Sequence, residues 1–183
     1  MNTKNVLKFV LSVLISESAG VIGFLFTSPA IERGWYESLT KPALTPLPWV
    51  FGPAWTMLYF LIGVSLYLVW KNDWVVVRPL YAQRPSWNKW SERFWRGDLQ
   101  KENTISVFYL HYTLNVLWSV VFFGFGRPDI AFFVLLALWT AAVYLMVNFY
   151  RVSKMAAWLL VPYFVWVTFA VYLNFFTWVL NAS

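Results

Sequence analysis

Residues 130–150 read IAFFVLLALWTAAVYLMVNFY, an unbroken apolar run of 21 residues without a formal charge. An α-helix rises about 1.5 Å per residue, so a run of this length crosses the roughly 30 Å hydrocarbon core of a bilayer. The run does not alternate apolar with polar residues as a barrel strand does, and a helix in lipid satisfies its own backbone polar groups. This stretch therefore predicts a transmembrane helix.

Four further charge-poor stretches repeat the pattern, at residues 9–26, 49–70, 105–125 and 155–180, and Glu17 is the single Asp, Glu, Lys or Arg within them. The whole chain is 60% hydrophobic and 12% charged, whereas a soluble domain carries about 25% charged residues. It has no cysteine, which excludes a disulfide framework and a thiol nucleophile. The sequence predicts an all-α integral membrane protein, a five-transmembrane-helix bundle that forms one domain over residues 1–183.

Basic residues are unevenly divided between the two sides of the predicted membrane. One side receives Lys4, Lys8, Lys71, Arg78, Arg84, Lys89, Arg93, Arg96, Lys101, Arg151 and Lys154, and the other receives Arg33, Lys41 and Arg127. Cytoplasmic loops are enriched in Lys and Arg, so we expect the N-terminus in the cytoplasm and the C-terminus outside. The net charge of +6 is then a topology signal, and no nucleic-acid partner is expected.

The connections between spans differ in length. Residues 126–129 and 151–154 are short, which predicts that the last three spans pack as antiparallel neighbours. The lid loop, residues 27–48, is rich in proline, which disfavours a helix, and it reads either as a rigid lid or as an interfacial loop with aromatic anchors. The long polar loop, residues 71–104, reads as an amphipathic interfacial segment or as a linker.

Aromatic and polar residues inside the spans fall on helical faces. The stripes are Asn115, Trp118, Ser119 and Phe122 in the third span, Trp55 and Tyr59 in the second, and Trp166 and Ala170 in the fifth. Polar groups at bilayer depth usually face the bundle interior, so these stripes predict an apolar cavity with a few polar groups, suited to a large flat ligand. Helix–helix packing is the commoner cause of such stripes, with Asn115 as an interhelical hydrogen-bonding residue.

Two titratable residues lie inside the predicted spans. Small neighbours of Glu17 (Ser12, Ser16, Ser18, Gly20 and Gly23) predict a close helix–helix contact in which Glu17 is hydrogen-bonded, with a functional role as the alternative. His111 has no further ligands at metal-binding spacing, so a structural histidine is expected and no metal site. The chain also lacks the P-loop, GxGxxG, HExxH and GxSxG motifs.

Four motifs carry a resemblance to a known family. They are Trp35-Tyr36 with Leu39 and Lys41-Pro42; Phe51-Gly52-Pro53-Ala54-Trp55 with Leu58-Tyr59; Asn115 with Trp118-Ser119 and Phe122-Phe123-Gly124; and Ala157-Trp158-Leu159-Leu160-Val161-Pro162-Tyr163 followed by Trp166, Phe169-Ala170 and Leu173-Asn174. With these motifs the chain resembles the translocator protein family, also called tryptophan-rich sensory proteins or peripheral benzodiazepine receptor homologues.

The resemblance implies a five-helix bundle, commonly a homodimer, that needs no cofactor and binds a porphyrin such as protoporphyrin IX, or another flat hydrophobic ligand, under the first loop. The ligand-binding residues implied by matching positions are Tyr36, Trp55, Tyr59, Asn115, Trp118, Ser119, Phe122, Trp166 and Ala170. Some bacterial members promote light-dependent breakdown of protoporphyrin IX, and by that likeness Trp55 and Trp166 are the implied catalytic residues.

The sequence leaves the role open between sensing, transport and light-dependent porphyrin degradation. A non-catalytic lipid- or sterol-binding regulatory or interaction protein, with partners at the long polar loop, is the alternative. The animal sterol motif at the end of the fifth span needs a Tyr and then a basic residue, but this chain has Phe175 and Val179 there. An alternating-access transporter ranks lower, since the proline-rich lid is the one candidate gate visible, and the absence of an internal repeat gives no support to an inverted-repeat transporter.

Overall fold

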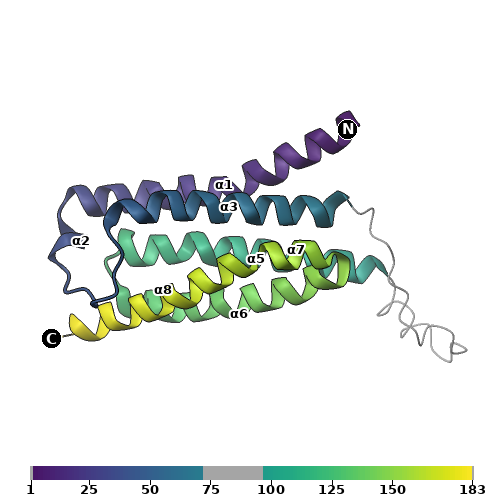
Figure 1. The fold of residues 1–183 in the computed structure, drawn as a ribbon. Helices are drawn as coiled ribbons and strands as arrows, with labels where there is room; N and C mark the ends of the chain where they lie inside the picture. Colours follow the sequence, from purple (N-terminus) through teal and green to yellow (C-terminus); the bar gives the residue numbers. More distant parts are fainter. Residues whose placement is uncertain (1, 72–96, 183) are drawn as a thin grey trace, which may run out of the picture.

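Five apolar helical segments run side by side through the molecule (Figure 1). The computed structural model describes residues 2–71 and 97–182, with the backbone alone for residues 97–103. Its elements are α1 (Thr3–Glu32), α2 (Trp35–Ser38), α3 (Pro48–Lys71), α5 (Gly97–Ser119), η1 (Val120–Gly124), α6 (Pro128–Val152), α7 (Lys154–Leu159) and α8 (Val161–Leu180). The predicted fold class is confirmed: the protein is a multi-pass integral membrane protein, and its described residues form no strand.

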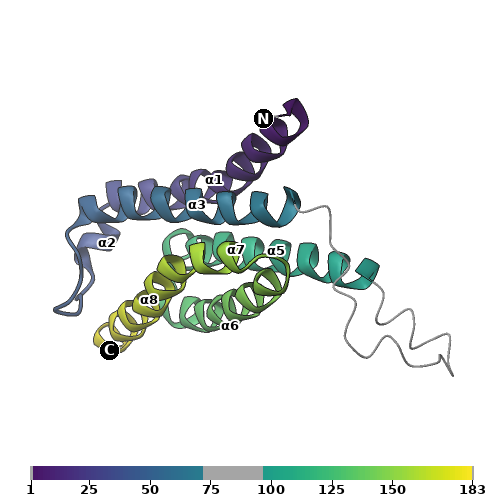
Figure 2. The ribbon, with the colours of Figure 1, turned by 45° about the vertical axis from the view of Figure 1, so that its right-hand side comes forward.

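The helices contact one another in a closed ring. Helix α1 packs against α3 and α5, α5 against α6, and α6 against α7 and α8, which in turn reach α3. The connections between these helices are residues 125–127 and Ser153, even shorter than the predicted 126–129 and 151–154, and they make α5, α6 and the α7–α8 pair antiparallel neighbours, as predicted (Figures 1 and 2). The odd number of crossings leaves the N- and C-terminal ends at opposite ends of the bundle (Figure 1).

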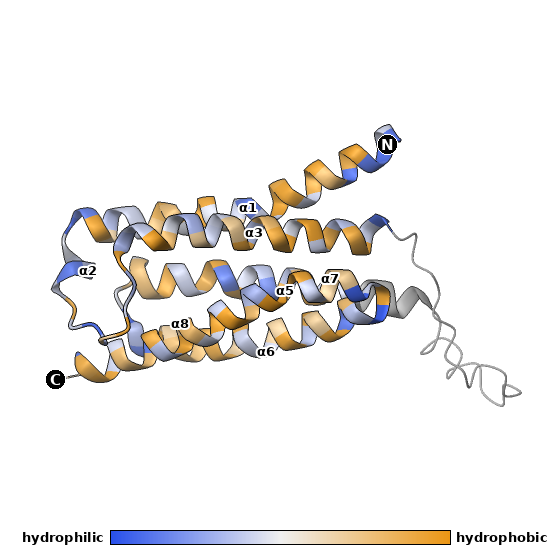
Figure 3. Cartoon of the chain, in the orientation of Figure 1, coloured by the Kyte–Doolittle hydropathy of each residue, from blue (hydrophilic) through white to orange (hydrophobic). Residues whose placement is uncertain are grey.

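Hydrophobic residues occur along every long helix (Figure 3), and many of them are exposed on the outside of the bundle while others form its core. Phe133 and Trp158 are 61% and 68% exposed, whereas the small polar side chains of Ser12 and Ser65 are fully buried. The Ser65 hydroxyl donates to the carbonyl oxygen of Ala156 at 2.7 Å and so joins α3 to α7. This distribution suits a molecule surrounded by lipid, where polar groups are satisfied inside the protein.

The backbones of helices α1 and α3 come close together at Gly63. A Cβ atom placed on this glycine would lie 2.7 Å from the Cα atom of Val13 and 3.1 Å from the carbonyl oxygen of Ser12. Small residues permit such an approach between membrane helices, because the backbones themselves come into contact. The close helix contact predicted from the small residues of the first span is therefore present.

Helix ends differ from those expected from hydropathy. Helix α1 covers Thr3–Glu32 instead of 9–26, and α5 starts at Gly97 instead of near residue 105. The predicted lid loop, 27–48, therefore loses its first residues to α1, and Trp35–Ser38 forms the short helix α2 within it. Charged residues indicate where the hydrocarbon core of the membrane ends. A helix can continue beyond that point until a turn in the backbone conformation ends it. For α1 this turn is Gly34, with φ +70°.

The expected single span 155–180 is divided in two. Helix α7 ends at Leu159 and α8 begins at Val161, with Pro162 in the first turn of α8. Proline has no N–H group, so it breaks the hydrogen-bond ladder but is tolerated at a helix start. Of the long polar loop, residues 72–96 lie outside the described part of the chain, so neither reading of that segment is tested.

Candidate ligand-binding cavity

A cavity of about 560 Å³ lies between α1, α3, the α5–η1 segment and α8. This volume falls within the roughly 300–1,000 Å³ range of small-molecule sites. Its lining residues are Glu17, Gly20, Val21, Gly23, Phe24, Thr27, Ile31, Tyr36, Thr45, Pro48, Phe51, Gly52, Trp55, Thr56, Tyr59, Trp118, Ser119, Phe122, Phe123, Trp166, Phe169, Ala170, Leu173, Asn174 and Thr177. Residues from all three stripes found in the sequence, with the exception of Asn115, therefore surround one space, as the cavity hypothesis predicts.

Trp55 is the centre of the aromatic wall. Its ring stacks on Tyr59 with centroids 5.4 Å apart and an interplanar angle of 25°. The rings of Trp118 and Trp166 each lie 6.2 Å from it, Trp166 edge-on at 86°. The wall thus offers both faces and edges of aromatic rings, which are the surfaces that bind flat conjugated molecules.

The end of α5 adds a cavity residue, Phe123, that the predicted stripe of the third span did not include. From Val120 to Gly124 the chain forms a π-helical turn, η1, and the amide of Phe125 donates to the carbonyl oxygen of Val120, five residues back. Phe122 and Phe123 both line the cavity. Phe123 lies four residues after Ser119 and eight after Asn115, so the helical pattern of the third span extends to it, although the predicted stripe ended at Phe122.

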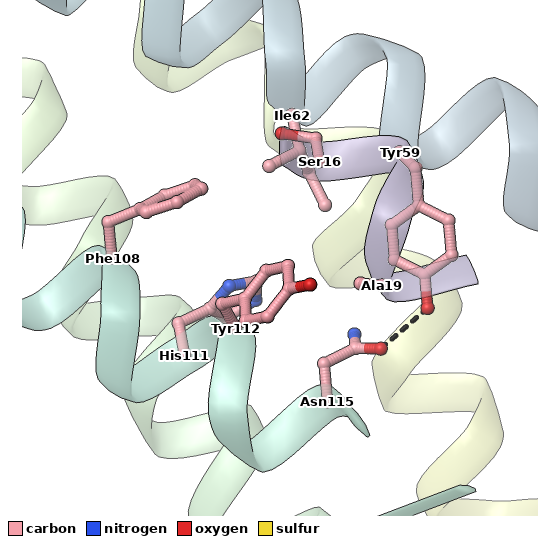
Figure 4. A pocket seen from close by; sticks show the side chains of 8 residues that line it. All are labelled: Ser16, Ala19, Tyr59, Ile62, Phe108, His111, Tyr112 and Asn115. Carbon is pink, nitrogen blue, oxygen red and sulfur yellow. Dashed lines mark hydrogen bonds between the residues drawn. The ribbon is translucent and has the colours of Figure 1, made fainter. Parts of the chain in front are cut away.

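Asn115 is the one predicted ligand-binding residue that does not line the cavity. Its side chain is buried and lines a second, small pocket (Figure 4), where the Tyr59 hydroxyl donates to Asn115 Oδ1 at 2.5 Å. Asn115 Nδ2 donates to the Tyr163 hydroxyl at 2.9 Å, and His111 Nε2 lies 2.8 Å from the same hydroxyl. Asn115 therefore holds Tyr59, which does line the cavity, and His111 has the structural contact expected of it.

Helix α8 supplies several lining residues beyond the predicted Trp166 and Ala170. Phe169, Leu173, Asn174 and Thr177 continue the same face at helical spacing, a signal present in the sequence but not extended that far. Asn174 also fixes the wall, because its Oδ1 accepts from Trp118 Nε1 at 2.9 Å and its Nδ2 donates to the Pro128 carbonyl at 2.7 Å.

The lid loop covers one end of the cavity through Tyr36 and Thr45. Trp35 packs edge-on against Phe122 at 5.8 Å, and the ammonium of Lys41 lies 4.5 Å from the centroid of the Tyr36 ring. Burial, and next the negative charge of Glu37, raise the pKa of Tyr36, so its phenol stays a neutral hydrogen-bonding group. Because Tyr36 and Thr45 line the cavity, this arrangement favours the hypothesis of a lid over the alternative of an interfacial loop with aromatic anchors.

Two hydrogen bonds tie the lid to the end of α8. The Thr40 amide donates to Asn181 Oδ1 at 3.0 Å, and Asn181 Nδ2 donates to the Thr40 carbonyl at 2.9 Å. We expect Asn181→Ala to raise amide exchange in the lid up to about thirtyfold, because it removes both hydrogen bonds and each stabilises by roughly 1 kcal/mol. Hydrogen–deuterium exchange of the peptide over residues 35–47 measures this. Peptides from α6 serve as the internal control, and unchanged lid exchange would contradict the tether.

The environment of Glu17 differs from the predicted one. Its side chain lines the cavity and makes no hydrogen bond or ion pair with the described residues, so the expected hydrogen bond is wrong. The small residues beside it face other helices of the same chain: a Cβ on Gly20 would lie 2.9 Å from the Tyr59 ring, and one on Gly23 would lie 3.0 Å from Ser119 Oγ. Because these glycines have no side chain, α1 can pack directly against the cavity-lining residues Tyr59 and Ser119.

The fold and the cavity define a class: a five-helix integral membrane protein with a ligand-sized aromatic cavity under a lid. The chain belongs to the TspO/MBR family, whose model matches residues 12–179. It is 38% identical over 178 residues to tryptophan-rich protein TspO of Archaeoglobus fulgidus, covering 97% of this chain and 99% of that protein. It is 33% identical to tryptophan-rich protein TspO of Chlorobaculum tepidum over 94% of each chain. It is 34% identical to the human translocator protein over 79% of this chain and 73% of that protein.

Proposed function

We propose that this protein binds a tetrapyrrole such as protoporphyrin IX in the cavity under the lid. The observation that carries the proposal is the aromatic wall, in which Trp55 stacks on Tyr59 and has Trp118 and Trp166 beside it in a space of about 560 Å³. Aromatic rings in this arrangement recognise a large flat conjugated molecule. The family membership supports the same ligand class. Arg33 and Lys41 are at the lid end, where they would meet propionates that extend from the cavity.

The test is a titration of protoporphyrin IX into detergent-purified protein, followed by tryptophan quenching and the Soret band. Trp166→Phe is a clean variant, because the buried Nε1 of Trp166 has no hydrogen-bond partner to lose. We expect saturable binding that this variant weakens about tenfold through lost ring contact. Trp158→Phe is the matched control, since Trp158 is 68% exposed and does not line the cavity. Weak, unsaturable binding that Trp166→Phe leaves unchanged would contradict the proposal.

Light-dependent degradation of the bound porphyrin is the second candidate function. The specific observation in its favour is that Trp55 and Trp166 line the same cavity with ring centroids 6.2 Å apart. Illumination of the bound complex separates the two roles: loss of porphyrin absorbance in the wild type, but not in the Trp55→Phe, Trp166→Phe variant, supports degradation. Stable porphyrin in both proteins supports a binder with a sensing or transport role. A non-catalytic lipid- or sterol-binding protein would show no saturable porphyrin binding.

Orientation and assembly are part of the same proposal. Lys4, Lys8, Lys71, Arg151 and Lys154 belong to one end of the bundle, and Arg33, Lys41 and Arg127 belong to the end with the lid. The positive-inside rule then puts the N-terminus in the cytoplasm and the lid outside. A homodimer is supported by the family resemblance, and Gly20 and Gly23 are not available for its interface because they pack within the chain.

A further inference from the structure

One carboxylate lies on the wall of an otherwise uncharged cavity. Among the lining residues, all of them in the described part of the chain, Glu17 carries the one formal charge. It makes no hydrogen bond or ion pair with the described residues. Tyr59 and Asn174 in the cavity wall already have partners, Asn115 and Trp118, whereas the Nε1–H of Trp166 has none but carries no charge. A charged group within a membrane-spanning segment is costly unless something pairs with it, which makes Glu17 a group in need of a partner.

The mouth of the cavity lies on the same side as Glu17. Six lining residues are also exposed on the surface of the bundle, and all of them lie on α1 and α3: Val21, Phe24, Ile31, Pro48, Gly52 and Thr56. The lining residues of α5, η1 and α8 are buried or half-buried. The cavity therefore opens sideways between α1 and α3. Val21 follows Glu17 by one helical turn, so the carboxylate is on the α1 edge of this mouth.

We infer that Glu17 is a ligand-recognition residue, which selects flat polycyclic ligands that carry a hydrogen-bond donor on the edge facing the α1–α3 mouth. A carboxylate forms its strongest hydrogen bonds with cationic N–H donors, so an ammonium group is the most favoured donor. This inference rests on one part of the proposed function, which is that the cavity binds flat aromatic ligands.

Three probes that share the pyrene ring system and differ in their substituent test this inference. They are 1-pyrenemethylammonium, 1-methylpyrene and 1-pyrenecarboxylate. Binding is measured by energy transfer from tryptophan to pyrene, with the full chain in nanodiscs of zwitterionic lipid. We expect the wild type to favour the ammonium probe over 1-methylpyrene about tenfold more than Glu17→Gln does, and to bind the carboxylate probe most weakly. Each probe also partitions into the lipid, but to the same extent with either protein. Comparing the ratio of the two affinities between the wild type and the variant therefore cancels this contribution.

The matched control is Glu32→Gln, which removes a carboxylate from the same helix outside the cavity. It is expected to keep the wild-type ratio. Glu17→Gln should also leave the affinity for 1-methylpyrene unchanged, which shows that the cavity is intact. The role of Glu17 would be overturned, while the proposed function stands, by either of two results. One is an equal ratio of affinities for the ammonium probe and 1-methylpyrene in the wild type and Glu17→Gln, and the other is an equal loss of affinity for these two probes in Glu17→Gln. Failure of every probe and of protoporphyrin IX to bind saturably would overturn both.

Discussion

Gly63→Ala is expected to destabilise the bundle by about 3 kcal/mol, at the upper end of the cost of overpacking a well-packed core. The added Cβ would lie 2.7 Å from Val13 Cα, which is backbone and cannot rotate away. Helix α1 must then move off α3, and the contacts along that interface are lost together. Denaturation of the purified protein in mixed detergent micelles, followed by circular dichroism, measures the change in the free energy of unfolding.

Gly52→Ala is the matched control on the same helix. No heavy atom lies within 4 Å of a Cβ placed on Gly52, so this variant adds the same methyl group without a clash. Its stability should stay within about 1 kcal/mol of the wild type, because alanine is the better helix former. Equal stability of the two variants would mean that α1 and α3 do not make the close contact at Gly63.

Asn115→Leu is expected to cost about 2 kcal/mol and to weaken ligand binding as well. The substitution leaves the buried Tyr59 hydroxyl without its acceptor and removes a donor from Tyr163. A buried polar group left without a partner costs about 1–3 kcal/mol. Tyr59 stacks on Trp55, so its release also disturbs the aromatic wall. The readouts are the free energy of unfolding and the affinity for protoporphyrin IX.

Asn148→Leu provides the comparison for this effect. Asn148 is also buried, but its Nδ2 donates to the Tyr144 carbonyl of its own helix, which keeps a helical partner. The variant removes an amide of the same size without disconnecting two helices, so we expect a smaller loss of stability and unchanged ligand affinity. If both variants behave alike, Asn115 does not hold Tyr59 in place for binding.

Much of the fold was predictable because hydropathy reports directly on the bilayer. The run 130–150 and its four counterparts defined the crossings, and the short connections defined which helices are neighbours. Helix ends were less predictable: α1 continues to Glu32 because a helix outlasts the apolar core, and Gly34 ends it. Pro162 was visible in the sequence, but its effect depends on whether it stands within a helix or at the start of one.

The cavity was predictable where helical spacing holds. Trp55 and Tyr59, and likewise Trp166 and Ala170, lie four residues apart and do face the same space. Phe123 was missed because the stripe was ended at Phe122, although Phe123 also lies at helical spacing from Ser119. Asn115 was misplaced because the same helical face lines the cavity at one height and the helix interface at another. Spacing assigns a residue to a face, but not to a depth along the bundle.

The sequence by itself determined that the chain crosses a membrane five times and which helical faces are rich in aromatic residues, since both follow from local composition and a fixed helical period. Only the tertiary structure decided that Glu17 lines a cavity without a partner in the described chain, that Gly63 meets a backbone, and that Asn181 holds the lid. These facts depend on which residues from distant parts of the chain come together. Packing fixes those pairs, and no local period encodes them.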